Sequence, residues 1–272
     1  MKILDGRELA LYIKERQAHE VRSLRGAKIF PRLLILRDSE NPVIMKYVGL
    51  KKLYGEDIGI EVIDKYADGK GELIKAIREA NEDKSISGII VQLPLTDKDI
   101  TDEVLAEISP KKDVDGLNPN VSDTERVFDS ATATAINWLM AGYNIELAPP
   151  KKIAIVGRGR LVGAPLYRMW KNSGFYIEMF HRGDELERLK DFDVVVTATG
   201  SPRIIKAEYL KPGAVVVDAG TASEDGVLVG DVDEDVRGCK DLGAITPKIG
   251  GVGPLTVSAL FDGVIRASKN NH

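Results

Sequence analysis

Residues 153–163 read Ile-Ala-Ile-Val-Gly-Arg-Gly-Arg-Leu-Val-Gly, an apolar run that ends in a glycine-rich turn, and helical periodicity follows. This order predicts a β-strand, a tight turn and the N-terminus of a helix. Glycines let a phosphate approach the backbone, and the free N–H groups of the helix favour an anion, so the turn can hold a pyrophosphate. The spacing G-x-G-x-x-x-G is one residue longer than the usual dinucleotide fingerprint, and a glycine-rich turn without a ligand is the alternative.

Similar apolar runs recur along the chain at intervals of roughly 25 residues, and segments with helical period lie between them. Such alternation is typical of right-handed βαβ units, so we expect an α/β fold with buried parallel strands. The expected strands are residues 33–36, 60–63, 88–93, 153–156, 175–180, 194–198 and 215–219, and the clearest helices are residues 72–81, 131–141, 166–171 and 254–269.

The alternation of strand and helix patterns stops between about Ser109 and Lys152. This region ends in the pair Pro149-Pro150, which is flanked by lysines and suits a hinge or linker. We therefore expect one α/β unit before this region and a second after it.

The composition excludes several classes of protein. The chain has 272 residues, with 38 Lys and Arg against 42 Asp and Glu, so no strong basic field would attract a nucleic acid. Cys239 is the only cysteine and there are three histidines, so we expect no metal site. We also expect no membrane partner and a reducing cytoplasm, because no apolar run approaches the ~20 residues that span a bilayer and the N-terminal residues do not resemble a signal peptide.

The end of the next strand bears on which nucleotide could bind. An NAD-specific site usually has an acid there to hold the ribose 2′-hydroxyl, but here His181-Arg182 follows the strand. Arg182, together with Arg158 in the turn, would suit the 2′-phosphate of NADP. Glu178 could instead be the acid of an NAD site, although its place inside the apolar run suggests a residue on the sheet face. An ordinary solvated arginine is the alternative for Arg182.

Tyr47, Lys51 and Gln92 are candidates for chemistry in the first half of the chain. Tyr47 and Lys51 are four residues apart, so on a helix they share one face. Gln92 interrupts an apolar run near the carboxyl end of an expected parallel strand, where open α/β sheets bind ligands. By themselves, Lys51 on a solvated helix face and Gln92 satisfied by neighbouring backbone are the simpler explanations.

Two loops are also ambiguous when taken separately. Asp113-Val-Asp115-Gly116 could be a plain turn, since Asp-Gly is a common turn dipeptide. Residues 250–254, Gly-Gly-Val-Gly-Pro, are either a loop before a helix or a backbone surface for a flat ligand. Pro254 at the first helical position with Gly253 as N-cap is the expected start of the last helix.

Several segments occur in the order found in one enzyme family. They are Tyr47-Val48 with Lys51, Val91-Gln92-Leu93-Pro94-Leu95, Lys112-Asp113-Val114-Asp115-Gly116-Leu117-Asn118-Pro119, Val156-Gly157-Arg158 with Val162-Gly163-Ala164-Pro165, and Ile245-Thr246-Pro247 with Gly250-Gly251-Val252-Gly253-Pro254. The sequence resembles the FolD family of bifunctional methylenetetrahydrofolate dehydrogenases and cyclohydrolases, from about residue 2 to residue 265.

The resemblance implies roles for individual residues. Lys51 would be the main catalytic residue, Gln92 would adjust it, Asp115 would anchor the pterin, and Tyr47 would pack against the folate rings. Substrate contacts are also expected at Gly251 and Pro254. The resemblance implies NADP as cofactor, with contacts from Gly157, Arg158, Gly159, Val162, Gly163, His181, Arg182 and Thr199.

The resemblance also implies how the chain is divided. It implies a catalytic, folate-binding domain of residues 1–130 plus 254–272 and a Rossmann-like NADP-binding domain of residues 131–253, with a cleft between them and a homodimer as the assembly. The expected activity oxidises 5,10-methylenetetrahydrofolate and hydrolyses the methenyl product to 10-formyltetrahydrofolate. Burial beside a cationic substrate would favour a neutral Lys51 amine, which assists the attack of water.

The sequence departs from the family pattern at several places. Ile44 stands where the family usually has a serine, and Gly159 stands where the nucleotide turn usually has one. These departures suggest one alternative, a dehydrogenase with weak or lost cyclohydrolase activity. A second alternative is a non-catalytic module that binds folate or nucleotide, and a third is a Rossmann-type dehydrogenase for an unrelated acid; the residues Tyr47, Lys51, Gln92 and Asp115 argue against the second.

Overall fold

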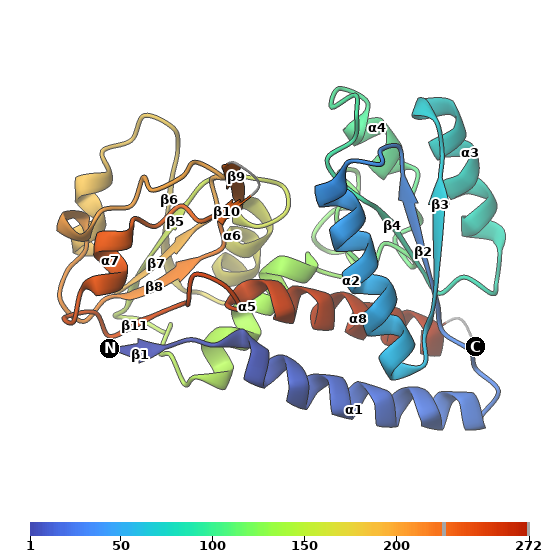
Figure 1. Cartoon of the computed structure of the whole chain (residues 1–272), viewed down its shortest axis with the longest axis horizontal. Helices are drawn as coiled ribbons and strands as arrows, with labels where there is room; N and C mark the ends of the chain where they lie inside the picture. Colours follow the sequence, from blue (N-terminus) through green and yellow to red (C-terminus); the bar gives the residue numbers. More distant parts are fainter. Residues whose placement is uncertain (225–226, 271–272) are drawn as a thin grey trace. The chain divides into compact units, whose positions relative to one another are not determined.

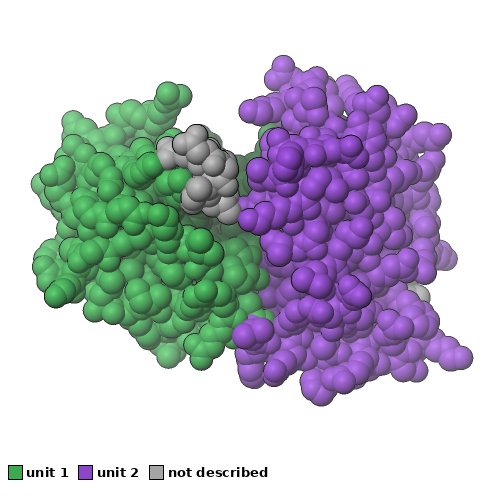
Figure 2. All heavy atoms as spheres, viewed as in Figure 1, with its two compact units in different colours: residues 1–10, 132–256 green, residues 11–131, 257–272 purple. Residues whose placement is uncertain are grey.

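The computed structural model describes residues 1–224 and 227–270, which form two compact units. Unit 1 comprises residues 1–10 and 132–256, and unit 2 comprises residues 11–131 and 257–272, of which residues 271–272 lie outside the described part. Figure 2 shows the residues of each unit. Both units contain a parallel sheet with helices, so the expected α/β class is confirmed.

Unit 2 is built on a three-stranded parallel sheet in the order β3-β2-β4 (Figure 1). Its strands are β2 (Arg32–Arg37), β3 (Glu61–Tyr66) and β4 (Gly88–Val91), and its helices are most of α1 (Gly6–Gly26), α2 (Pro42–Ile58), α3 (Gly69–Glu82), α4 (Thr101–Ala106) and most of α8 (Val252–Asn270). The strands β2 and β4 are buried because they are largely apolar: β4 is Gly-Ile-Ile-Val, with every residue buried. The edge strand β3 is half polar and only partly buried. Leu36, Leu73 and Ile77 belong to the core between the strands and helices α3 and α4.

Helix α2 carries Tyr47 and Lys51, and both of its ends are defined by local chemistry. The side chain of Asn41 caps the N-terminus by accepting a hydrogen bond from the N–H of Val43, and Pro42 occupies the first turn. Gly59 ends the helix in the left-handed conformation, with φ of 82°. These two signals set the length of the helix and therefore which residues face the sheet.

Unit 1 contains a six-stranded parallel sheet in the order β6-β5-β7-β8-β11-β1 (Figure 1). The strands are β1 (Lys2–Ile3), β5 (Lys152–Val156), β6 (Tyr176–Phe180), β7 (Val194–Thr197), β8 (Val215–Asp218) and β11 (Ala244–Ile245), with a separate antiparallel hairpin of β9 (Ala222–Glu224) and β10 (Val227–Val229). The helices are α5 (Ala131–Gly142), α6 (Gly163–Asn172) and α7 (Glu234–Gly238), and the short 3₁₀ segments are η1 (Leu186–Asp191) and η2 (Ala207–Tyr209).

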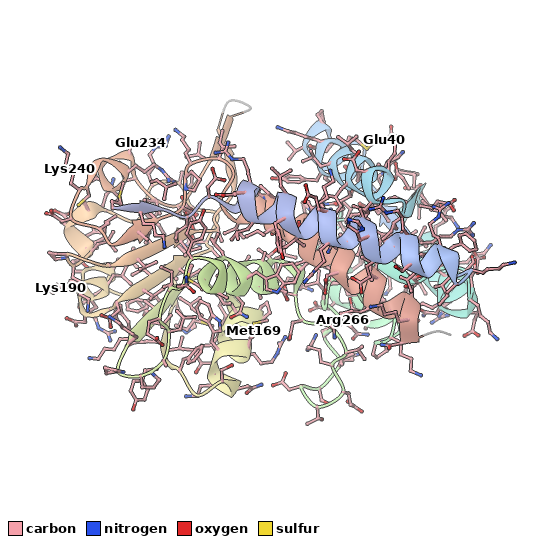
Figure 3. The ribbon with its side chains drawn as sticks, turned by 90° about the horizontal axis from the view of Figure 1, so that it is seen from below. Glu40, Met169, Lys190, Glu234, Lys240 and Arg266 are labelled. Carbon is pink, nitrogen blue, oxygen red and sulfur yellow. The ribbon has the colours of Figure 1, made fainter. Side chains whose placement is uncertain are left out.

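The seven strands expected from the sequence are all present, with ends shifted by at most three residues. Their apolar side chains are buried in the interior of each unit, whereas charged side chains such as Lys190, Glu234 and Lys240 point outward from unit 1 (Figure 3). The last helix begins at Val252, so Gly253 lies inside the helix and is not its N-cap. None of the helices in the described ranges is both long and apolar enough to cross a membrane.

The N-terminal boundary of the units differs from the expected division. Residues 1–10 belong to unit 1, because Lys2 and Ile3 pair in parallel with Ala244 and Ile245 of β11. The N–H of Gly6 also donates a 2.9 Å hydrogen bond to the carbonyl of Gly250. The expected change of unit near residue 130 and the return near residue 254 lie close to the observed ones, at residues 131–132 and 256–257.

The pair Pro149-Pro150 is not a linker between units. It lies inside unit 1, in the connection from α5 to β5, and the bond between the two prolines is cis. The chain instead changes unit at the start of α5 and within the helices α1 and α8. A continuous helix can carry the chain from one unit to the next without any Pro-rich segment, which is why composition misplaced the linker.

Candidate active site

The side chains of Lys51 and Gln92 meet in unit 2. The amine of Lys51, on α2, donates a 2.6 Å hydrogen bond to Oε1 of Gln92, which follows β4 directly. Gln92 is itself held at two points: its backbone N–H donates to the carbonyl of Leu36 at 2.8 Å, and its Nε2 donates to the carbonyl of Leu93 at 3.0 Å. The amide is therefore oriented so that its oxygen faces the lysine.

Asp115 lies close enough to Lys51 for the two charges to interact. Burial lowers the pKa of Lys51, and the charge of Asp115 opposes that shift. Burial likewise raises the pKa of Asp115, and the charge of Lys51 opposes it. Both groups are thus displaced toward their neutral forms, since burial disfavours a charge. Lys51, Gln92 and Asp115 form one cluster, as the sequence predicted.

The loop that contains Asp115 is held in place by hydrogen bonds to the buried carboxylate of Asp113. Asp113 is only 4% exposed, and its carboxylate accepts hydrogen bonds from the N–H of Leu117 at 3.2 Å and from that of Asn118 at 2.8 Å. Burial raises the pKa of Asp113 to about 6. Gly116 takes the left-handed conformation, with φ of 64°. Asp113-Gly116 is therefore a turn, as the simpler explanation held, but one that fixes the position of Asp115.

Tyr47 and Ile44 lie on α2, and their burial differs. Tyr47 is half-buried and sits one helical turn before Lys51, so the two share a face as expected. Ile44 is 6% exposed and belongs to the core of unit 2. The residue that replaces the family's usual serine therefore packs as an apolar core residue.

The glycine-rich turn of unit 1 connects β5 to α6, and its backbone is tightly packed. Gly157 has φ of 105°, and a Cβ there would lie 2.6 Å from the carbonyl oxygen of Ala198. A Cβ on Gly163 would lie 1.9 Å from the carbonyl oxygen of Gly157. Only glycine fits at these two positions. Gly159 differs, because a Cβ there would meet nothing closer than 3.9 Å.

The N-terminus of α6 faces this turn without a side-chain cap. Val162 occupies the cap position and makes no capping hydrogen bond through its side chain. The N–H of Ala164 donates to the carbonyl of Gly159 at 3.1 Å and Pro165 has no N–H, so an anion here would be bound through the N–H of Gly163 and the helix dipole. A glycine cradle at the start of a helix, after an inner strand of a parallel sheet, fits a dinucleotide pyrophosphate.

The other predicted nucleotide residues lie at the carboxyl ends of the neighbouring strands. His181 and Arg182 follow β6 and are exposed, as is Arg158 in the turn. Glu178 forms a 2.6 Å ion pair with Arg188, which agrees with a residue on the sheet face, and the carboxylate of Asp184 accepts a 2.6 Å hydrogen bond from the N–H of His181. Thr199 follows β7, where its N–H donates a 2.6 Å hydrogen bond to Asp231.

Gly251 and Pro254, predicted to contact the substrate, belong to unit 1 and not to the unit that holds Lys51. Gly251 packs between the backbone of Gly6 and the side chain of Thr246. A Cβ on Gly6 would lie 1.9 Å from the carbonyl oxygen of Gly251, and a Cβ on Gly251 would lie 2.9 Å from the Cβ atom of Thr246. The described residues contain no group of three or more His, Cys, Asp or Glu side chains placed to hold a metal ion.

Comparison with known proteins identifies both parts of the chain. Residues 4–115 match the catalytic domain, and residues 130–272 the NAD(P)-binding domain, of tetrahydrofolate dehydrogenase/cyclohydrolase. The chain belongs to this family. The bifunctional protein FolD of Lactobacillus delbrueckii subsp. bulgaricus is 37% identical over 281 residues, which cover 100% of this chain and 98% of that protein.

Solved structures of FolD proteins share the whole architecture. The bifunctional FolD of Campylobacter jejuni has a TM-score of 0.92 and 31% identity, with 100% of each chain covered. The Trypanosoma brucei FolD, solved with NADP cofactor and an inhibitor, has a TM-score of 0.89 and 30% identity, with 98% of this chain and 97% of that chain covered. The resemblance read from the sequence motifs is thus confirmed over the full FolD fold.

Some buried polar residues of this FolD member were not singled out from the sequence. Asp113 and Asn118 lay in a quoted motif without a role, and Asp231 lay in no quoted motif at all. An acidic residue in an apolar context, such as Val-Gly-Asp231-Val, is the signal that could have drawn attention to it.

Proposed function

We propose that this chain oxidises 5,10-methylenetetrahydrofolate with NADP⁺ and hydrolyses the methenyl product to 10-formyltetrahydrofolate. As a member of its family it is a bifunctional methylenetetrahydrofolate dehydrogenase and methenyltetrahydrofolate cyclohydrolase. The choice of NADP and the roles of individual residues are the finer parts of the proposal. The 2.6 Å hydrogen bond from Lys51 to Gln92, beside Asp115, is the observation that carries the proposed catalytic roles.

The dehydrogenase step depends on positioning. A dinucleotide held by unit 1 would supply the hydride acceptor for the substrate's one-carbon bridge, so the protein has chiefly to align the two. In our proposal the ring of Tyr47 packs on the folate ring system, and Asp115 holds the pterin by hydrogen bonds. Gly251 and Pro254 contribute backbone contacts. The support is that Tyr47 and Lys51 share a helix face and that Asp115 lies beside Lys51.

The cyclohydrolase step needs a base that is neutral near pH 7. A lysine of ordinary pKa is almost fully protonated there, and burial lowers the pKa of Lys51. A neutral amine donates one hydrogen to Oε1 of Gln92 and keeps its lone pair free to accept a proton from the attacking water. The cationic methenyl substrate would disfavour a charged Lys51 further. Lys51 is therefore the proposed catalytic residue, and Gln92 orients its amine.

NADP is the proposed cofactor because the two residues that directly follow β6 have basic side chains, and the nearest acid after them, Asp184, accepts a 2.6 Å hydrogen bond from the N–H of His181. His181 and Arg182 are exposed there, Arg158 is exposed in the adjoining turn, and Glu178 is paired with Arg188. A 2′-phosphate carries charge that arginines bind well, whereas NAD sites hold the free 2′-hydroxyl with an acid. Gly157, Gly159, Val162 and Gly163 would hold the pyrophosphate, and Thr199 would contact the nicotinamide half.

The assembly and the compartment remain predictions. A homodimer is expected from the family resemblance, and a cytoplasmic location from the composition of the chain. Sedimentation of the purified protein would test the first.

A coupled spectrophotometric assay tests the proposed function and the cofactor together. Purified protein is mixed with methylenetetrahydrofolate and either NADP⁺ or NAD⁺, and the reduced nucleotide and the methenyl intermediate are followed. We expect faster reduction of NADP⁺, with no lasting accumulation of the methenyl compound. Accumulation without 10-formyl product would support a dehydrogenase that lacks efficient hydrolysis, and absence of any reduction would support a binding module.

A further inference from the structure

A fully buried carboxylate lies at the carboxyl end of β7 in unit 1. Asp231 is 0% exposed, and its Oδ2 accepts two hydrogen bonds of 2.6 Å, one from the hydroxyl of Thr197 and one from the N–H of Thr199. Both donors lie at the carboxyl end of β7. Asp231 therefore holds the segment in which β7 ends.

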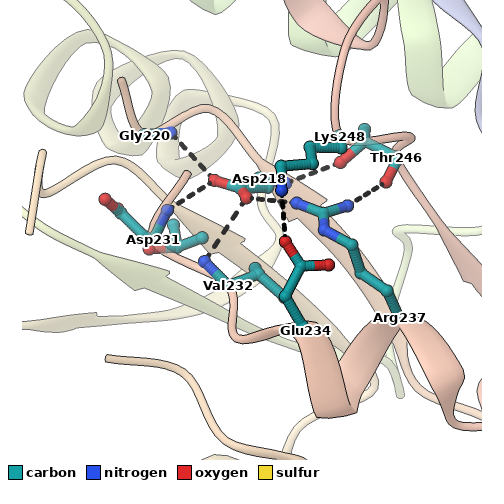
Figure 4. Close-up of polar contacts among 9 residues, drawn as sticks. Asp218, Gly220, Asp231, Val232, Glu234, Arg237, Thr246 and Lys248 are labelled. Carbon is teal, nitrogen blue, oxygen red and sulfur yellow. Dashed lines mark hydrogen bonds and ion pairs between the residues drawn. The ribbon is translucent and has the colours of Figure 1, made fainter. Parts of the chain in front are cut away.

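A second carboxylate, Asp218, extends this arrangement to the next strand (Figure 4). Asp218 ends β8, and its Oδ1 accepts hydrogen bonds from the N–H of Asp231 at 3.1 Å and of Gly220 at 3.2 Å. Arg237 donates to Oδ2 of Asp218 at 2.7 Å and to the carbonyl of Thr246 at 2.9 Å. We call Asp218, Asp231 and Arg237 the strand-end cluster.

Two glycines make room for the carboxylates of the strand-end cluster. A Cβ on Gly220 would lie 2.1 Å from Oδ1 of Asp231, and a Cβ on Gly230 would lie 2.0 Å from Oδ2 of Asp218. Each carboxylate thus packs against the backbone of the strand-end loop that leads to the other. The loops after β7 and β8 are fixed relative to each other by these contacts.

Burying the strand-end cluster costs free energy of folding. It contains two carboxylates against one guanidinium, and Oδ1 of Asp231 has no hydrogen-bond partner among residues 1–224 and 227–270. Burial raises the pKa of Asp218, and the charge of Asp231 adds to that shift. Buried groups that break the rule of full pairing are concentrated at functional sites.

The position of the strand-end cluster relates it to one half of the nucleotide. In a doubly wound sheet the pyrophosphate sits at the first glycine-rich turn, here after β5, and the adenosine ribose lies at the end of the neighbouring strand, here β6. We therefore expect the nicotinamide half to lie at the ends of β7 and β8, on the other side of β5. The loops that Asp231 and Asp218 hold are those ends.

We infer that Asp231 is a positioning residue for the nicotinamide half of the cofactor. It fixes the Thr197–Thr199 segment directly and the Gly220 loop through Asp218. Its negative charge also favours the oxidised nicotinamide, which is a cation, over the neutral reduced form. This inference rests on the proposed function in that a dinucleotide is the hydride acceptor.

The two activities of the protein provide the test, because hydrolysis of the methenyl substrate consumes no nucleotide. In Asp231→Asn the amide oxygen can still accept both hydrogen bonds, but the charge is gone and an NH₂ group takes the place of the unpaired Oδ1. We expect kcat/KM for NADP⁺ to fall about tenfold or more, because two charged hydrogen bonds become neutral and a buried donor is left without a partner. Cyclohydrolase turnover should stay within about twofold of the wild-type turnover, a change smaller than that of one lost hydrogen bond. Binding titrations should show a larger loss of affinity for NADP⁺ than for NADPH.

Two further variants keep the test decisive. Asp241→Asn alters an exposed aspartate of the same unit and should leave both activities unchanged. Thr197→Val keeps the shape of the side chain but removes one donor to Asp231, so it should reduce the dehydrogenase selectively even if Asp231→Asn fails to fold. Equal loss of both activities, or no loss of either, would overturn the inference. If the wild-type protein uses NAD⁺ instead, the proposed cofactor choice fails, and the same measurements with NAD⁺ still test Asp231.

Discussion

The amine of Lys51 donates a 2.6 Å hydrogen bond to Oε1 of Gln92, although 41 residues separate the two in the chain. The helix α2 supplies the lysine, and the end of β4 supplies the amide. Asp115 comes from a third segment, and its charge opposes the lowering of the Lys51 pKa by burial. The protonation of Lys51 is therefore set by neighbours that can be changed one at a time.

Replacing Lys51 by Met should abolish most of the cyclohydrolase activity. General acid–base catalysis typically contributes about 10²-fold to 10⁴-fold, so we expect a loss of at least about 100-fold in turnover of methenyltetrahydrofolate. Lys52→Met is the matched control, because Lys52 is the exposed neighbour on the same helix. A Lys51→Met protein with full turnover would rule out the proposed role.

Replacing Gln92 by Glu should move the pH dependence of the cyclohydrolase upward. A negative charge beside Lys51 favours the protonated amine and raises its pKa, so less neutral amine is present at pH 7. The turnover at neutral pH should fall, and the rising limb of the pH–rate profile should shift to higher pH. Gln92→Met, which removes the hydrogen bond without adding charge, should lower the rate without that upward shift.

Replacing Asp115 by Asn should have the opposite effect on the same profile. The charge of Asp115 raises the pKa of Lys51, so its removal lowers that pKa and shifts the rising limb to lower pH. The KM for the folate substrate should also increase, because the proposed pterin anchor is lost, while the KM for NADP⁺ should not. Asp99→Asn, at an exposed position of the same unit, serves as the control. A shift to higher pH would contradict the assignment.

Replacing Arg182 by Ser should weaken the preference for NADP⁺. Arg182 is exposed at the end of β6, where it can reach a 2′-phosphate but has no group to bind on NAD⁺. We expect the KM for NADP⁺ to rise about tenfold, which corresponds to one charged hydrogen bond, and that for NAD⁺ to stay constant. Lys190→Ser removes an exposed positive charge elsewhere in unit 1 and should change neither constant. Equal effects on both nucleotides would show that Arg182 does not read the 2′-phosphate.

Replacing Gly116 by Ala should destabilise the protein more than the same change at Gly69. Both glycines are left-handed, with φ of 64° and 69°, and that conformation alone costs an alanine about 1 kcal/mol. A Cβ on Gly116 would also lie 2.6 Å from the carbonyl oxygen of Phe128, whereas nothing lies within 4 Å at Gly69. Thermal unfolding of the two variants measures the difference. Equal unfolding temperatures would show that the loop around Gly116 can rearrange to accommodate a Cβ atom.

The residues of the Lys51 cluster were predicted through the resemblance to the FolD family, because each local pattern taken alone left a simpler explanation open. Lys51 has helical spacing from Tyr47, Gln92 interrupts a strand pattern, and Asp115 lies in an Asp-Gly turn. The structure brings them together because the carboxyl ends of parallel strands and the helix packed beside them meet at one edge of the sheet. The order of the motifs supplied the prediction, and the sheet topology explains why the three side chains meet.

The division of the chain shows where local pattern was insufficient. The strand β1 is two residues long and too short for any periodicity, yet it pairs with β11 more than 200 residues later and draws residues 1–10 into unit 1. Pro149-Pro150 has the composition of a linker but lies within that unit.

By itself, the sequence determined the α/β class, the glycine-rich turn after β5 and the family to which the chain belongs, because these depend on residue type and spacing within short segments. Only the tertiary structure decided which distant segments share a sheet, which way the amide of Gln92 points, and that Asp231 holds the ends of β7 and β8. Such hydrogen bonds join atoms from segments far apart in the chain, and a buried carboxylate reveals its role only through the donors that fold around it.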